Sequence, residues 1–172
     1  MLYKLTNAAM PTTTVITPVT TGTTIKTMLQ VKLGTSVNNV GRVVEWGISF
    51  DGSAAAAGIR VELCTTGAIK ATVTEFLATG IQNLSDPYAA AVTDDNPFAF
   101  GAAGDESGYT ATAEGSITSV RVFDSQIIQP TSQYVKQYPL GREPAFNNTE
   151  YLRIRVLAAA AVNAYCYVIV EV

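Results

Sequence analysis

The chain of 172 residues contains no histidine, and this absence removes several kinds of chemistry at once. Ser-His-Asp triads, Cys-His pairs and histidine-based metal sites all require an imidazole. The two cysteines, Cys64 and Cys166, lie far apart in strand-like segments, without metal-ligand spacing or a dense disulfide pattern. We therefore expect two buried free thiols, with a bridge between them as the alternative.

Carboxylates remain as catalytic candidates, because a glycosidase needs only two acids about 5 to 10 Å apart. Glu45 and Glu62 lie in strand-like segments, where solvent-facing residues are the simpler interpretation. The acidic runs 94–96 and 105–106 offer oxygen ligands for Ca²⁺ but lack the regular spacing of a calcium loop, so we expect turns there. The sequence thus predicts a protein that is not an enzyme and holds no metal or cofactor.

Charged residues are also scarce, at 15% of the chain against 48% hydrophobic residues. A surface so poor in charge predicts that partners cover part of it, as in an oligomer or a lattice. The net charge of −3 gives no basic footprint for nucleic acid or anionic lipid. No apolar run reaches the about 18 residues of a membrane span, and the segment from Met1 lacks the apolar core of a secretory signal. We expect synthesis in a cytoplasm, without nucleic acid or membrane as a partner.

What the sequence does contain is alternation of apolar and polar residues, which predicts strands at short intervals. The predicted strands span residues 24–33, 42–50, 59–64, 71–77, 116–128, 133–138, 151–156 and 164–172. Turn signals such as Asp51-Gly52 separate them. No segment combines a helix cap with a following period of 3.6 residues, so we expect an all-β chain.

Roughly eight antiparallel strands match a jelly roll built from two Greek keys, and we predict this sandwich for residues 23–172. In this topology the last strand is central in its sheet, beside the first and third predicted strands. Cys64 and Cys166 would then lie on adjacent strands. An immunoglobulin-like sandwich is the alternative, weakened because no Cys…Trp…Cys spacing surrounds Trp46.

Two stretches depart from the strand pattern. Residues 1–22 are rich in Thr and Pro and predict an extended N-terminal arm, either lying on a neighbouring subunit or flexible. Residues 80–114 lack periodicity and carry many turn signals, which predicts a long contact loop. Aromatic residues scattered through this loop predict that it packs against something, and they are Tyr88, Phe98, Phe100 and Tyr109.

The strand at 151–156 has one apolar face and one charged face. Arg153 and Arg155 are predicted to lie on the solvated face of this strand, as ordinary solvated or cross-strand paired arginines. As the alternative, they would form an anion site at a subunit junction together with Arg142.

The last strand is apolar or aromatic on both faces, and such a strand needs cover on two sides. One side faces the core of the domain. The other carries Tyr165, Tyr167 and Ile169, and it is covered by a neighbouring subunit or a folded-back arm. The alternative is a central sandwich strand with a partly exposed aromatic side.

Several segments resemble those of a small structural protein encoded by tailed phages and prophages, many of them from actinobacterial hosts. They are residues 2–9 (LYKLTNAA), 20–30 (TTGTTIKTMLQ), 138–144 (YPLGREP), 152–156 (LRIRV) and 162–168 (VNAYCYV). The likeness covers both ends of the chain and is weakest in the 80–114 loop.

The resemblance implies a virion protein of the capsid surface, a decoration or cement protein that assembles as a homotrimer on the major capsid protein. The aromatic side of the last strand would form the trimer contact, and the arm would bind the capsid. The trimer residues are Tyr165, Tyr167 and Ile169, and the arm residues are Leu2, Tyr3, Pro11, Val15 and Ile16. The alternative is a receptor- or glycan-binding head of a tail fibre or spike that uses the 80–114 loop.

Overall fold

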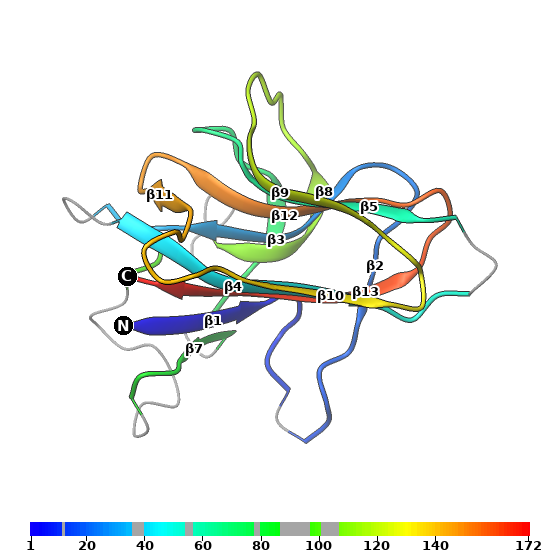
Figure 1. Ribbon diagram of the computed structural model, residues 1–172, viewed down its shortest axis with the longest axis horizontal. Helices are drawn as coiled ribbons and strands as arrows, with labels where there is room; N and C mark the ends of the chain where they lie inside the picture. Colours follow the sequence, from blue (N-terminus) through cyan, green and yellow to red (C-terminus); the bar gives the residue numbers. More distant parts are fainter. Residues whose placement is uncertain (12, 36–39, 54–56, 78–79, 87–96, 101–106) are drawn as a thin grey trace.

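The computed structural model describes residues 1–11, 13–35, 40–53, 57–77, 80–86, 97–100 and 107–172. It consists of two antiparallel β-sheets that pack face to face around one apolar core (Figure 1). No α-helix occurs in these ranges, so the predicted all-β class is confirmed. It follows that none of these ranges contains a helix long and apolar enough to cross a membrane.

Over the described residues, the two sheets contain thirteen strands. In spatial order, sheet A contains β10 (Gln133–Gln137), β4 (Val40–Phe50), β13 (Asn163–Glu171), β1 (Leu2–Thr6) and β7 (Ile81–Asn83), with β11 (Ala145–Asn147) also paired to β4 and β2 (Val19–Thr20) to β13. Sheet B contains β6 (Thr72–Glu75), β8 (Gly108–Ala113), β3 (Lys26–Lys32), β12 (Tyr151–Leu157), β5 (Ile59–Thr65) and β9 (Arg121–Ile128). Each of the longer predicted strands is present, whereas β1, β2, β7, β8 and β11 are additional.

The N-terminal segment is a strand of the sheet, which corrects the prediction of an arm over residues 1–22. β1 lies between β13 and β7 and pairs with both. Tyr3 is only 4% exposed, and its ring meets Phe98 edge to face at a centroid distance of 5.2 Å. Alternation over β1 turns the side chains of Tyr3 and Leu5 toward the core, and burying them stabilises β1 within the sheet. The Pro-rich part of the segment, which favoured an arm, begins only after β1.

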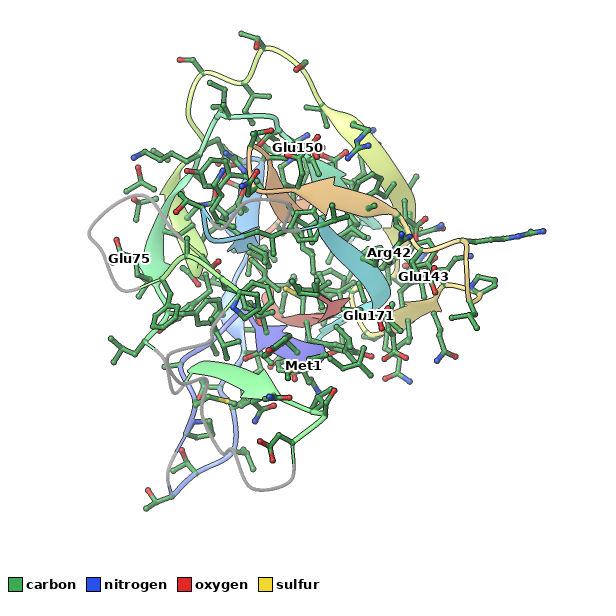
Figure 2. All side chains as sticks on the ribbon, turned by 90° about the vertical axis from the view of Figure 1, so that its left-hand side faces the viewer. Met1, Arg42, Glu75, Glu143, Glu150 and Glu171 are labelled. Carbon is green, nitrogen blue, oxygen red and sulfur yellow. The ribbon has the colours of Figure 1, made fainter. Side chains whose placement is uncertain are left out.

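Both termini lie at one end of the molecule, where Figure 1 marks them. The amino group of Met1 donates a hydrogen bond of 2.6 Å to the carbonyl oxygen of Val172, and the Val172 amide donates one of 3.0 Å to the Met1 carbonyl. Figure 2 looks onto this end and shows Met1 beside Glu171, whose strand partner is Leu2.

The place predicted for the last strand, beside the first and third predicted strands, is taken by the strand before it. β12, not the last strand, lies between β3 and β5, and its residues Leu152, Ile154 and Val156 face the core as predicted. β13 is central in the other sheet, between β4 and β1. Its central place is therefore confirmed, whereas its predicted neighbours are wrong, because β1 occupies one side of it.

Cys64 and Cys166 lie on β5 and β13, in different sheets, so the prediction of adjacent strands is wrong. Both are free and buried, as expected. Burial raises the pKa of the Cys64 thiol to about 12 and also raises that of Cys166. Neither residue forms a thiolate near neutral pH, so neither is an activated nucleophile.

The predicted 80–114 loop begins and ends as sheet structure, because β7 and β8 occupy its two ends. Residues 87–96 and 101–106, which include the acidic runs and Tyr88, lie outside the described residues. Phe98 is buried against Tyr3, and the ring of Tyr109 lies 5.4 Å from that of Phe76. The expectation that the aromatic residues pack is confirmed for these two, but they pack into the chain's own core.

Candidate interaction surface

The side of β13 that faces away from the core carries Tyr165, Tyr167 and Ile169, all half-buried. The neighbouring strands bring further side chains to the same outer face of sheet A, because cross-strand partners share a face. We call this surface the tyrosine face. It includes Lys4, Glu45, Gly47, Ser49, Gln133, Val135, Gln137, Tyr165, Tyr167 and Ile169.

Gly47 gives the tyrosine face its shape. It is the strand partner of both Tyr167 and Val135, so it lies between them. A Cβ atom added to Gly47 would stand 2.7 Å from Cε1 of Tyr167, closer than any real contact. The missing side chain therefore allows the Tyr167 ring to lie over the backbone of β4.

The Tyr167 hydroxyl is held at its outer end. It donates a hydrogen bond of 2.6 Å to Oε1 of Glu45. The ammonium group of Lys4 lies 4.6 Å from the centre of the ring, in cation–π contact. Burial, followed by the Glu45 carboxylate, raises the pKa of Tyr167, so the ring presents a neutral, fixed hydroxyl at neutral pH.

Tyr165 and Val135 extend the apolar part of the face. The rings of Tyr165 and Tyr167 lie 6.2 Å apart at an angle of 36°, within the range of attractive aromatic pairs. Val135 is 52% exposed. The result is a preorganised surface of aromatic and aliphatic groups, beside which lie the polar side chains of Ser49, Gln133 and Gln137, the Glu45 carboxylate and the Lys4 ammonium group.

Within the single chain, β13 is central in its sheet and its aromatic side is half-buried, while cover by a neighbouring subunit stays a prediction. β1 lies beside β13 in the sheet, and only its Lys4 side chain reaches over the Tyr167 ring. The sequence analysis missed Lys4, Glu45 and Gly47 as parts of this face. Gly47 carried a signal, because a glycine inside an otherwise regular strand often marks a close approach.

Arg153 and Arg155 are buried, so the predicted solvated face is wrong, whereas the predicted cross-strand pairing holds for Arg155, whose strand partner is Glu62. Arg153 is 0% exposed, and its Nη1 donates a hydrogen bond of 3.0 Å to the Glu114 carbonyl oxygen. Its Nη2 donates to the carbonyl oxygen of Ile69. The segments around Ile69 and Glu114 fold over the outer face of sheet B and supply these acceptors, so solvent is not needed there.

The Nε group of Arg155 donates a hydrogen bond of 2.6 Å to Oε1 of Glu62. Arg142 instead lies exposed between β10 and β11, so the predicted anion site of three arginines does not form. Glu45 and Glu62 belong to different sheets and bind Tyr167 and Arg155. They are therefore not a pair of acids across one site.

The predicted arm residues divide into two groups. Leu2 and Tyr3 belong to β1 and are committed to the sheet. Pro11, Val15 and Ile16 lie between β1 and β2, and Val15 is 85% exposed. Figure 1 shows this connection projecting from the sandwich. Only the second group remains accessible to a partner.

No family model matches the chain, and no curated protein matches it either. Among the described residues, no group of three or more metal-binding side chains occurs.

Proposed function

We propose that the chain is a structural protein of a phage virion, a capsid decoration protein whose copies form trimers and bind the major capsid protein. The observation that carries the proposal is the tyrosine face. It carries a preorganised aromatic pair, and it belongs to a sequence with only 15% charged residues. Central parts of protein interfaces are enriched in such aromatic residues and depleted of charge.

An estimate of energies shows why such a protein would use more than one contact. Burying roughly 400 Å² of apolar surface per subunit, at about 25 cal/mol/Å², contributes about 10 kcal/mol. Association itself costs about 4 to 15 kcal/mol, so one face alone gives modest affinity. A trimer that touches several capsid subunits adds its contacts through multivalency.

The connection between β1 and β2 is the proposed capsid contact. It retains Pro11, Val15 and Ile16 from the predicted arm, whereas Leu2 and Tyr3 are left out because they hold the sheet together. An exposed apolar side chain on a projecting segment, such as Val15, is a suitable anchor for a pocket on a partner.

The strand order in sheet B supports the proposal that the sandwich is a jelly roll. β3 and β5, the first and third of the predicted strands, flank one common strand. In the topology expected for a jelly roll the last strand takes that place, and here β12 takes it. We propose that the fold is a jelly roll extended by β13 and β1 in the opposite sheet.

The decisive test examines particles of the phage or prophage that encodes the chain. Electron cryomicroscopy is expected to find it as trimers on the capsid exterior, and the purified protein is expected to have a trimeric mass by light scattering. Val135→Asp should reduce this mass to that of a monomer, while Val15→Asp should keep the trimer and lose capsid binding. A wild-type monomer at micromolar concentration would remove the trimer, and particles without the protein would remove the virion role.

A receptor- or glycan-binding head of a tail fibre or spike is the second candidate. The observation in its favour is the pair of Tyr165 and Tyr167 rings beside the Glu45 carboxylate. Ligand sites combine such apolar rings with a few polar groups that orient the ligand, and a sugar could use both. The 80–114 loop contributes less than predicted, because Phe98 and Tyr109 pack internally. Binding to host cell wall but not to capsids would favour this candidate.

A further inference from the structure

A pocket of about 210 Å³ opens on the outer face of sheet B, where β5 begins and β12 ends. The ion pair of Arg155 and Glu62 lies in it, so its charged groups neutralise one another. Ile25 and Leu157 provide partly exposed apolar walls, and the exposed Arg60 also lines it. At about 30 Å³ per water molecule, the pocket has room for one aliphatic side chain in place of several waters.

The molecule also carries an apolar side chain that nothing covers. Leu140 is 96% exposed, the highest value among the large apolar side chains of the described residues. It lies in a turn closed by a hydrogen bond of 2.9 Å from the Arg142 amide to the Pro139 carbonyl oxygen. Gly141 follows it with φ of 79°, which the turn requires and glycine permits. The turn fixes the backbone, so burying Leu140 against a partner orders little additional chain.

The pocket and Leu140 lie at opposite ends of the molecule. Figure 1 shows the connection between β10 and β11 at the end that carries the C terminus, whereas β5 begins at the other end. Figure 2 looks onto the first of these ends and shows Glu143 there, three residues after Leu140. One chain cannot place its own leucine in its own pocket, but a second copy can.

The two ends offer one pair of opposite charges, Glu143 and Arg60, and the turn also carries the exposed Arg142. Glu143 follows the exposed leucine, and Arg60 lies at the pocket. Within the part of the chain that the structure describes, neither forms an ion pair. An approach that seats Leu140 between Ile25 and Leu157 brings a carboxylate and a guanidinium group, both without partners, to the same contact.

We propose that Leu140 of one copy inserts into this pocket of a second copy, with Glu143 beside Arg60, so that copies join head to tail. Such a contact joins two different patches, and it either closes a ring or continues as a chain. It is separate from the tyrosine face, and it holds whether or not the chain is a virion protein. One buried leucine and one charge pair make a weak contact, so association depends on concentration and strengthens where other contacts already hold copies together.

Sedimentation of the purified protein over a concentration series tests the contact. The wild-type mass is expected to rise with concentration. Leu140→Asp should abolish this rise, while the matched control Val15→Asp, which also places a charge on a highly exposed side chain, should keep it. Glu143→Arg should weaken association about tenfold at low salt, and adding Arg60→Glu should restore it. A Leu140→Asp protein that associates like the wild type would overturn the proposal.

A mixing experiment separates this contact from loss of folding and from the tyrosine face. Leu140→Asp removes the leucine, and Leu157→Asp blocks the pocket, so each variant alone should fail to associate further. Mixed together, they retain one intact leucine and one intact pocket and should form one head-to-tail contact. Absence of that contact, with the wild type still associating, would refute the proposal. Val135→Asp reports separately on the tyrosine face, because it should change the mass at the lowest concentration.

Discussion

Trp46 and Asp124 connect the two sheets through a hydrogen bond of 3.2 Å from the indole Nε1 to Oδ2 of the carboxylate. Trp46 belongs to β4 of sheet A and is fully buried, and Asp124 belongs to β9 at the edge of sheet B. The Tyr134 hydroxyl donates to the same oxygen at 2.8 Å, and Gln126 donates to the other oxygen at 3.0 Å. One carboxylate thus satisfies three donors where the sandwich closes on this side.

Asp124→Ala is expected to lower the free energy of unfolding by about 2 to 4 kcal/mol, because it leaves the Trp46 and Tyr134 donors without their acceptor. Urea unfolding followed by tryptophan fluorescence measures the change, since Trp46 is the only tryptophan. Asp51→Ala, at an exposed position, is the matched control and should change stability by less than about 0.5 kcal/mol. Equal midpoints for the two variants would contradict the role of Asp124.

Tyr138 should make stability fall at high pH. Burial, followed by the charge of Asp124, raises its pKa to about 12 from the usual 10.0. Both states hold the proton below pH 10, but above it the unfolded state loses the proton first. The contribution of Tyr138 is therefore complete below about pH 10 and is lost as the pH rises toward 12.

Tyr138→Phe should reduce this loss, and it should leave stability at pH 7 unchanged or higher. The reason is that the buried Tyr138 hydroxyl lies near the Trp46 side chain but makes no hydrogen bond of ordinary length and angle within the described residues. Urea unfolding at a series of pH values measures both effects. A variant with lower stability at pH 7 and the same steep loss at high pH would show that the hydroxyl is bonded.

Gly47→Ala should destabilise the protein by about 1 to 3 kcal/mol, because its methyl group and the Tyr167 ring cannot occupy the same space. Gly34→Ala is the control, since its nearest contact would be an ordinary 3.5 Å. If the Tyr167 ring causes the loss, Tyr167→Ala should lower the free energy of unfolding less in the Gly47→Ala background than in the wild type. Simple addition of the two losses would place the strain elsewhere.

The buried ion pair of Arg155 and Glu62 should behave unlike an exposed one. Arg155→Met is expected to cost about 2 to 4 kcal/mol, because it leaves Glu62 partly buried without its partner. Arg155→Met combined with Glu62→Leu should recover much of this loss. Arg121→Met, which breaks a more exposed pair with Glu150, should cost less than about 1 kcal/mol. Similar losses for the two arginines would contradict the assigned burial.

The sequence was sufficient for the strands that alternate over six or more residues. The apolar positions of β12 specify its core face, as the burial of Leu152, Ile154 and Val156 confirms. β1 and β7 escaped prediction because their pairing, with β13 and with each other, joins segments that are distant in the sequence. The same limit explains why the predicted neighbours of β13 are wrong.

The burial of Arg153 and Arg155 could not be predicted from alternation, which identifies two faces of a strand but not what lies above each. The Glu114 and Ile69 acceptors come from segments distant in the sequence. Alternation likewise placed three side chains on the outer face of β13, namely Tyr165, Tyr167 and Ile169. It did not indicate that the outer face of β12, which carries the arginines, is covered. In both cases the sequence indicates which side chains share a face, and only folding decides whether that face is covered.

The hydrogen bonds between Met1 and Val172 have a practical consequence for engineering. A peptide or reporter domain attached before Met1 or after Val172 would leave the molecule from the same place, so either attachment site should display cargo in nearly the same position. A short linker could join the two ends, and new ends could then be opened in an exposed connection such as that between β1 and β2. Such a circular permutant should keep both sheets, because no strand pairing is cut.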